Sequence, residues 1–170
     1  SVRAKRAAGR DRDAALWQAM AEAGWTGILL PEEIGGAGLT PAEQAVVSEG
    51  LGRALISEPI AISAVLSSGL LARSAPSTAR KRLAGGLVEG SLVLAPAWMD
   101  APGRAAAARV APGGGFTMSG TKRHVDFAVS ATDFLVIADM PEGAGLFSVP
   151  AGAPGVSVET AAGVDGAAIG

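Results

Sequence analysis

The stretch GWTGILLPEEIGGAGLTPAE, residues 24–43, decides the fold of the first half of this chain. Its apolar residues are suited to burial, and Pro31 prevents a helix from continuing through them. The glycines within residues 35–38 allow positive φ and close backbone approach, which favours a tight, packed loop. Residues 40–43, Thr-Pro-Ala-Glu, combine an N-cap, a proline at the first helical position and a glutamate that can reach back to the cap. The stretch therefore predicts a packed loop that leads into a new helix.

Apolar residues recur at helical spacing on both sides of this stretch. Leu16, Met20 and Ala23 stand at i, i+4 and i+7, and Gly24 follows them as a C-cap. Pro59 can open a later helix, whose apolar face is expected to consist of Ile62, Val65, Leu66 and Leu70. A shorter basic helix should end at the glycine pair of residues 85–86. Four helices are predicted, at residues 13–23, 41–54, 59–70 and 76–83, and they define an all-helical domain over residues 1–87.

After Gly90 the helical period gives way to short apolar runs that are separated by turn residues. The runs predict strands at residues 92–94, 116–118, 134–137, 146–149 and 156–158. Proline and glycine clusters supply the turns between them, and residues 113–115 are expected to form a flexible hairpin rather than a phosphate cradle. Short strands at this spacing favour an antiparallel sheet or barrel over residues 88–170. The fold class expected for the chain is therefore α+β, with the helical domain first.

Three motifs resemble the acyl-CoA dehydrogenase family. Residues 24–43 are similar to the family's "GW.GL..PEE.GG.GL...E" stretch before a long helix, and residues 49–55, EGLGRAL, are similar to its "E-x-L-G-R-A-L". Residues 120–122, Gly-Thr-Lys, are similar to the "G-x-K" that precedes a flavin-contacting strand. The resemblance spans most of the chain and implies the family's first two domains, the second of them incomplete. The resemblance further implies that the family's C-terminal helical bundle, which supplies most of the FAD pocket and usually the catalytic glutamate, is not expected within these residues.

The resemblance also implies four cofactor-binding residues, Ala97, Trp98, His124 and Asp126. Ala97 and Trp98 stand near the threonine and glutamate of the family's "T-E-P-x-A-G-S-D" motif, from which residues 95–103 depart. His124 and Asp126 stand at the aromatic and threonine positions that follow "G-x-K". An ionised aspartate accepts hydrogen bonds without donating any, and its charge opposes negative charge on a reduced flavin. Each residue also has a plainer interpretation: packing for Trp98, a strand surface for His124, and a turn for Asp126.

The function that the resemblance implies is FAD-dependent α,β-dehydrogenation of an acyl-CoA thioester, in lipid or sterol side-chain breakdown. The implied partners are the acyl-CoA substrate, electron-transfer flavoprotein as acceptor, and further acyl-CoA dehydrogenase subunits in a homo- or hetero-oligomer. No catalytic residue is assigned, because the base would lie beyond Gly170. The departures at Trp98 and Asp126 favour an alternative, a non-catalytic scaffold subunit of a heteromeric complex. A free-standing β-domain binding module is a third, weaker hypothesis.

Composition excludes several other classes of protein. The chain is 49% hydrophobic and 18% charged, which is typical of a globular fold. A net charge of −2 and a pI near 5.4 provide no positive field for nucleic acid. The absence of cysteine and the single histidine, His124, exclude a thiolate or multi-imidazole metal site. No apolar run approaches the roughly 20 residues that cross a bilayer, and no signal segment is recognisable, so a cytoplasmic location without membrane association is expected.

Overall fold

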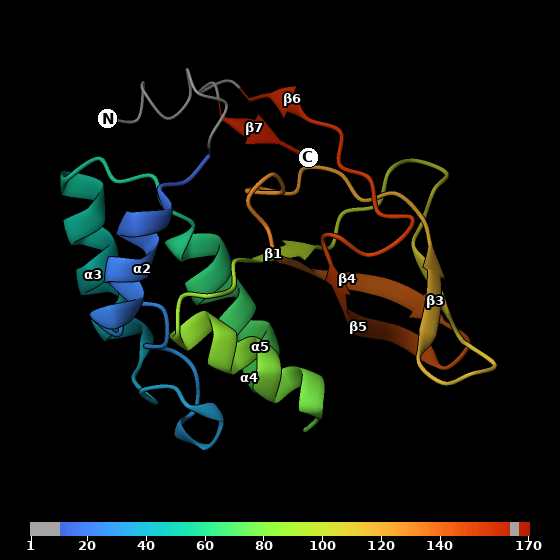
Figure 1. Cartoon of the computed structure of the whole chain (residues 1–170), viewed down its shortest axis with the longest axis horizontal. Coiled ribbons are helices and arrows are strands. Elements are labelled where there is room, and N and C mark those ends of the chain that lie inside the picture. The colour runs from blue at the N-terminus through green and yellow to red at the C-terminus, as the bar shows by residue number, and fades with distance from the viewer. Residues whose placement is uncertain (1–10, 164–166) are drawn as a thin grey trace.

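The computed structural model describes residues 11–163 and 167–170, which form a helical lobe and a strand lobe side by side (Figure 1). The rest of the two predicted domains, residues 1–10 and 164–166, lies outside the described residues. The helical lobe consists of α2 (Ala14–Glu22), the 3-10 helix η1 (Glu32–Ile34), α3 (Pro41–Arg53), the π-helix η2 (Ile60–Ser67), α4 (Ser68–Arg73) and α5 (Thr78–Val88).

The strand lobe follows the helical lobe in the chain, which confirms the α+β order. It consists of β1 (Leu94–Ala97), β2 (Ala107–Val110), β3 (Phe116–Ser119), β4 (Asp133–Met140), β5 (Gly143–Pro150), β6 (Ala161–Ala162) and β7 (Ala168–Ile169). Within the described part of the chain, every helix is too short or too polar to traverse a lipid bilayer.

The glycine-rich loop after α2 folds back on itself as predicted. The amide of Gly38 donates to the Leu30 carbonyl at 2.9 Å, and the amide of Leu39 donates to the Ile28 carbonyl at 3.0 Å. A Cβ atom at Gly36 would lie 2.0 Å from the carbonyl oxygen of Leu30, so the closest approach requires a glycine. The loop therefore packs its two halves together before α3 begins.

The predicted N-terminus of α3 is confirmed in detail. The side chain of Thr40 accepts a hydrogen bond from the Ala42 amide at 3.2 Å, and the Thr40 amide donates to the Glu43 carboxylate at 2.9 Å. The hydrogen bond from the Thr40 side chain, followed by backbone amides, lowers the pKa of the Glu43 carboxyl. At the other end, Leu55 has φ 52, a conformation that usually requires glycine, and its side chain is 80% exposed.

The buried face of the third predicted helix differs from the expected one. The predicted apolar face at residues 62, 65, 66 and 70 is wrong, because Leu66 is exposed and the other three are only partly buried. The buried side chains from Ser63 to Ser68 are instead small, and they are Ser63, Ala64, Ser67 and Ser68. Ser63 donates from its hydroxyl to the Leu94 carbonyl at 2.7 Å. The π-helical repeat brings these serines against β1, where their small size allows a close approach.

The last helix, α5, continues through the glycine pair that was expected to end it. Gly86 lies inside the helix, and a Cβ atom there would lie 2.4 Å from the Leu92 side chain, so this glycine serves packing rather than termination. The helix ends where Gly90 adopts φ 74 and its amide donates to the Leu87 carbonyl at 3.2 Å.

The main sheet is mixed, which corrects the expectation of a purely antiparallel one. β4 pairs with β5 in antiparallel fashion along its whole length, but β1 pairs with β4 in parallel, with Leu94 opposite Asp133 and Ala97 opposite Val136. β2 meets the far end of β4, also in parallel, and forms an antiparallel hairpin with β3. Parallel pairing is possible because the long segment between β1 and β4, which contains the hairpin, supplies the crossover. The described strands do not close into a barrel.

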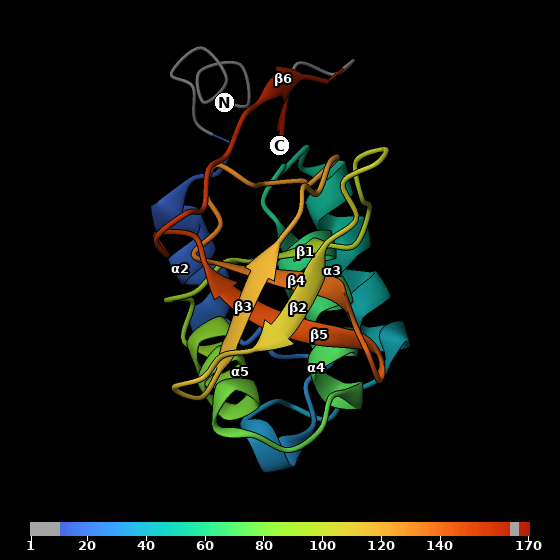
Figure 2. The same cartoon turned by 90° about the vertical axis from the view of Figure 1, so that its right-hand side faces the viewer.

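Two further strand predictions need correction. Residues 156–158 form no strand, although the segment is apolar in part. β2 was not predicted, because its sequence, Ala-Ala-Arg-Val, has neither bulky alternation nor strong β propensity. Figure 2 shows β2 and β3 lying across β4 and β5, and Ala108 and Met118 pack there against the second hydrophobic core.

The two lobes share a hydrophobic core. Trp17, Leu87 and other helical side chains pack with Leu94 and Leu135 from the sheet. Alternation along β4 points Phe134 to the second core, which fills the space beneath β2 and β3. The division of the chain into domains at residues 87 and 88 stays a prediction, and a shared core lies across it.

Candidate cofactor-binding face

Ala97 and Trp98 stand where β1 ends. Ala97 is the last residue of the strand, is 3% exposed and lies opposite Val136. Trp98 lies just beyond the strand and is 46% exposed, so its indole is not a core side chain. The indole lies just past the carboxyl end of a four-residue strand whose start is held by the helical lobe.

The segment that contains His124 and Asp126 is a loop, which corrects the expected flavin-contacting strand. Lys122 and Asp126 form isolated bridges, and the residues between them belong to no strand. His124 and Phe127 have φ 54 and φ 56, a left-handed conformation that is strained for side chains of this kind. Between them Val125 is 5% exposed and anchors the loop, while His124 is exposed and Asp126 is partly buried.

Backbone contacts bring the two predicted pairs of residues to the same end of the sheet. The Arg123 amide donates to the Met99 carbonyl at 2.9 Å, and the ammonium of Lys122 donates to the Trp98 carbonyl at 3.4 Å. The residues after β1 therefore run beside the His124 loop. Trp98 and His124 are consequently neighbours in the fold, although 25 residues separate them in the sequence.

An ion pair links the same two segments. The ammonium of Lys122 lies 2.6 Å from the Asp100 carboxylate, and the Ala106 amide also donates to that carboxylate at 2.9 Å. These two hydrogen bonds, with the one from Lys122 the larger effect, lower the pKa of the Asp100 carboxyl. Sequence reasoning missed Asp100, and its only signal was a carboxylate in the turn-rich stretch that replaces the family motif.

The end of the described chain occupies one side of the Asp126 loop. The Val125 amide donates to the Gly170 carbonyl at 2.8 Å, and the Gly170 amide donates to the Val125 carbonyl at 3.1 Å. Asp126 forms a bridge with Ile169, the last residue of β7. A Cβ atom at Gly170 would lie 2.5 Å from the Ala128 side chain, so the approach is close. The backbone of the Asp126 loop is thus paired on this side.

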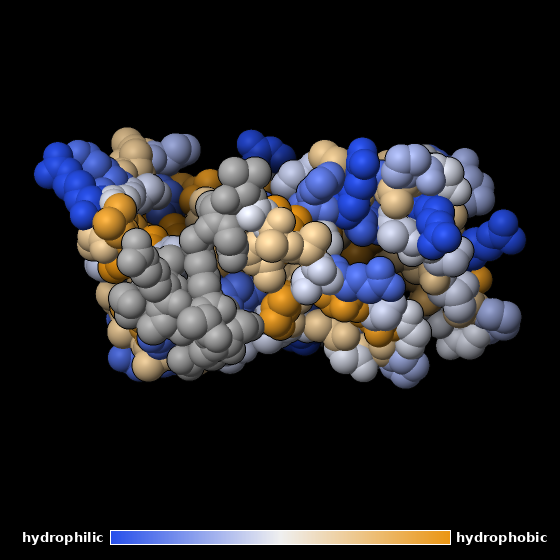
Figure 3. All heavy atoms as spheres, turned by 90° about the horizontal axis from the view of Figure 1, so that it is seen from above, coloured by the Kyte–Doolittle hydropathy of each residue, from blue (hydrophilic) through white to orange (hydrophobic). Residues whose placement is uncertain are grey.

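Exposed apolar side chains surround these loops. Val158 approaches to 3.5 Å the position that a Cβ atom of Gly170 would occupy, and Met99, next to Trp98, accepts a backbone hydrogen bond from Arg123 in the His124 loop. Figure 3 views the molecule from the side of β6 and β7, and apolar side chains gather near the middle of this face between polar ones. Independently of that view, we give the name Trp98 face to the exposed and partly exposed residues around the His124 loop, and we define it by Trp98, Met99, His124, Asp126 and Val158. An indole, a thioether and an aliphatic group beside two polar side chains can hold a planar heteroaromatic ring.

Other candidate groups lie elsewhere. Glu32 and Glu33 line an open depression of 440 Å³ near the loop before α3, together with apolar residues and none of the four predicted cofactor residues. The carboxylate of Glu33 lies 3.4 Å from the guanidinium of Arg80, so this glutamate serves an ion pair. Across the described ranges, no three His, Cys, Asp or Glu side chains converge as a metal site would require.

Comparison with known proteins agrees with the fold and the motif order. Residues 2–91 match the family model "Acyl-CoA dehydrogenase, N-terminal domain". The acyl-CoA dehydrogenase FadE27 of Mycobacterium tuberculosis is 34% identical over 146 residues, which cover 86% of this chain and 39% of that protein. The chain therefore spans well under half the length of this relative.

Two solved structures show the same arrangement. The ChsE4–ChsE5 complex from Mycobacterium tuberculosis superposes with a TM-score of 0.82 at 32% identity, covering 93% of this chain and 43% of that one. A G363A variant of the Tcur3481–Tcur3483 steroid acyl-CoA dehydrogenase superposes with a TM-score of 0.77 at 34% identity, covering 93% and 44%. Since the family model matches more than half of the residues, this chain belongs to the acyl-CoA dehydrogenase family.

Proposed function

We propose that this chain is the helical and β part of an FAD-dependent acyl-CoA dehydrogenase, which removes hydrogen from the α and β carbons of an acyl-CoA thioester. The observation that carries the proposal is the placement of Trp98 beside His124 at one end of the sheet, through the contacts of Arg123 and Lys122 with the segment after β1. Membership of the family supports it. FAD would supply the hydride acceptor.

The residues of the Trp98 face fit a flavin in part. The exposed indole of Trp98 offers an aromatic surface for a ring, whereas Ala97 is buried and can only support that indole from within the core. His124 can donate a hydrogen bond, whereas Asp126 while ionised can only accept one. We propose that His124 takes the donor role and that Asp126 binds a ring N–H group.

The descriptions of the relatives support a proposal for the substrate and the partners. A solved relative is described as a steroid acyl-CoA dehydrogenase, and we propose an acyl-CoA with a sterol-derived side chain as substrate. Two solved relatives are named as pairs of chains, which supports assembly with further subunits of the family. Electron-transfer flavoprotein as acceptor and a cytoplasmic location complete the proposal.

The test is reconstitution of the intact protein with FAD, followed by absorbance spectroscopy. We expect a flavin band that bleaches when acyl-CoA is added, and Trp98→Ala should weaken FAD binding about tenfold, as expected for loss of one stacked aromatic group. Val46→Ala, which truncates another exposed apolar side chain on α3, is the matched control and should leave FAD binding unchanged. Absence of a flavin band in the parent protein would refute the active enzyme.

We propose the scaffold subunit as a second candidate, because the pairing of Asp126 with Ile169 favours it. The bridge to Ile169 occupies one side of the Asp126 backbone. His124 has a positive φ, which differs from the extended conformation of a strand residue. A scaffold would form a stable mixed complex with a family member encoded nearby, while its own Trp98 face would hold no flavin. Co-expression with that partner and counting of flavin per subunit separates the two candidates.

A further inference from the structure

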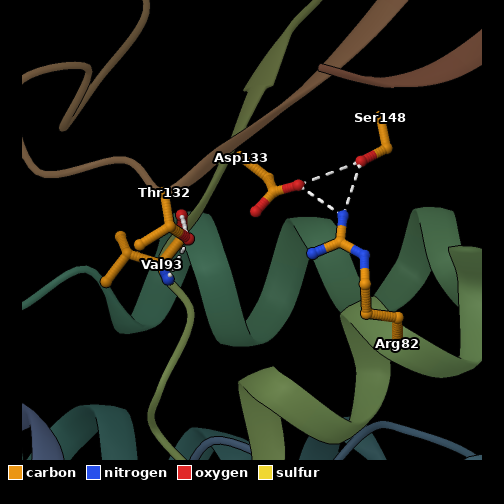
Figure 4. Close-up of polar contacts among 5 residues, drawn as sticks. All are labelled: Arg82, Val93, Thr132, Asp133 and Ser148. Carbon is orange, nitrogen blue, oxygen red and sulfur yellow. Dashed lines mark hydrogen bonds and ion pairs between the residues drawn. The ribbon is translucent and has the colours of Figure 1, made fainter. Parts of the chain in front are cut away.

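A buried carboxylate joins the helical lobe to the sheet. Asp133, the first residue of β4, has a side chain that is only 4% exposed, and its Oδ1 atom lies 2.5 Å from Nη2 of Arg82 on α5. The hydroxyl of Ser148 on β5 donates to the same oxygen at 3.1 Å, and Nη2 of Arg82 also donates to that hydroxyl at 3.1 Å. Figure 4 shows the three side chains converging from a helix and two strands. We name this group the Arg82 latch.

The latch is more than a surface ion pair. A carboxylate removed from water requires a cation or several donors. Arg82 lies 51 residues from Asp133 in the sequence, and Ser148 lies on the next strand, 15 residues away. Arg82 is 49% exposed, so its charge reaches the interior from the surface of α5. Loss of Arg82 would leave the Asp133 carboxylate buried without its cation.

Hydrogen bonds hold the residue before β1 next to the Arg82 latch. The Val93 amide donates to the Thr132 hydroxyl at 3.0 Å, and the Thr132 amide donates to the Val93 carbonyl at 2.9 Å (Figure 4). Thr132 directly precedes Asp133. The Arg82–Asp133 ion pair is therefore connected to the start of β1 through one residue and its hydrogen bonds to Val93. β1 then runs to Ala97, and Trp98 follows it in the chain.

A second contact ties the lobes three residues earlier. The backbone amide of Ser130 donates to the Asp11 carboxylate at 3.3 Å, and its hydroxyl donates to the same carboxylate. Asp11 precedes α2, so the helical lobe holds this strand-lobe segment from two separate elements. These two polar contacts add to the hydrophobic core that the lobes share, and they restrict rotation of one lobe on the other.

We propose that Arg82 is a positioning residue, which acts through Asp133 to hold the sheet in one orientation on the helical lobe. By fixing the starts of β4 and β1, it sets where the Trp98 face lies relative to the helices. A ligand that contacts both lobes is therefore bound in a site whose geometry depends on Arg82. Only this last step depends on the proposed function.

The distance between the lobes tests the proposal directly. The chain contains no cysteine, so Ser48→Cys on α3 and Ser119→Cys on β3, both exposed, can carry a pair of spin labels. We expect Arg82→Gln to broaden or shift the distance distribution measured by electron paramagnetic resonance. Arg82→Lys should restore it, because a single nitrogen makes the contact. Arg53→Gln, which breaks the exposed Arg53–Glu49 ion pair, is the control and should leave the distribution unchanged.

A distribution for Arg82→Gln that matches the parent would overturn the proposal. If Arg82→Gln does not fold, the double variant Arg82→Gln with Asp133→Asn removes the buried charge as well, and its distribution decides the question in the same way.

Flavin binding gives an independent readout. In the intact protein, Arg82→Gln should weaken FAD binding roughly tenfold, with recovery in Arg82→Lys, since coupling through packed elements typically has this size. A parent protein that binds no FAD refutes the proposed function, while the label distances still decide the role of Arg82.

Discussion

The ammonium of Lys122 lies 2.6 Å from the carboxylate of Asp100 and joins the two segments that carry the Trp98 face. The hydrogen bond from Lys122, and after it the one from the Ala106 amide, keeps the pKa of Asp100 below its ordinary value. A carboxyl whose pKa is lowered by folding stabilises the protein fully above its unfolded pKa, and this contribution is lost as the pH falls through the folded pKa. We therefore predict that Lys122→Met raises the pKa of Asp100 and moves the onset of acid-induced loosening of this region to higher pH. Titration of the side-chain carboxyl by NMR checks the prediction.

Lys81→Met removes an exposed lysine from α5 and is a suitable control. An unchanged Asp100 titration in Lys122→Met would show that the ion pair does not hold the two segments.

Thr40→Ala should destabilise the protein by about 1 kcal/mol, because the variant loses an N-cap side chain. The hydroxyl of Thr40 accepts from the Ala42 amide and donates to the Glu43 carboxylate, so its removal should also raise the pKa of Glu43. Urea unfolding measures the first effect and NMR titration the second. Ser48→Ala, in the exposed middle of the same helix, should change stability little, and equal effects of the two variants would contradict the capping role.

Gly36→Ala and Gly50→Ala should have opposite effects. A Cβ atom at Gly36 would lie 2.0 Å from the Leu30 carbonyl oxygen, so the loop must shift, at a cost of about 1–3 kcal/mol. A Cβ atom at Gly50 meets no atom within 4 Å on the surface of α3, and alanine there should stabilise by about 0.5–1 kcal/mol. Thermal unfolding of the two variants and the parent protein measures both effects. A Gly36→Ala protein as stable as the parent would mean that the loop is not packed as described.

Leu55→Gly should stabilise the protein by about 1 kcal/mol, although it removes a large side chain. Leu55 has φ 52 and is 80% exposed, so the substitution relieves a left-handed conformation and exposes less apolar surface. Ala54→Gly, one residue earlier and with negative φ, should destabilise instead. A loss of stability in Leu55→Gly would indicate that the side chain has a contact of its own.

Local signals in the sequence were sufficient for much of the helical lobe. The Thr40 cap, the Gly36 loop and the strands around Phe134 and Leu146 depend on neighbours within a few residues, and all appear where they were expected. The face of η2 was wrong because hydrophobic periodicity assumes an α-helical repeat, whereas the buried side depends on the carbonyl of Leu94, 31 residues away from Ser63. The parallel pairing of β1 with β4 could not be predicted from the sequence either, because the register between distant strands has no local signature.

In the candidate site, too, features with a local sequence signal were predicted and features that depend on distant residues were not. Ala97, Trp98, His124 and Asp126 were chosen by their positions in motifs, and the fold places their two segments side by side. Asp100 and Arg82 were missed because their importance lies in partners at distant positions, Lys122 and Asp133. Whether the four predicted residues bind FAD stays a prediction.

The wide turns of η2 make the length of this segment as important as its composition. Within Ile60–Ser67 the wide repeat decides which side chains face β1, so removing one residue there would change that set of side chains. The hydrogen bond from the Ser67 hydroxyl to the Leu94 carbonyl depends on this repeat. Insertions and deletions should accordingly accumulate at the exposed glycine turn of residues 113–115, while relatives that share this helix keep its residue count unchanged.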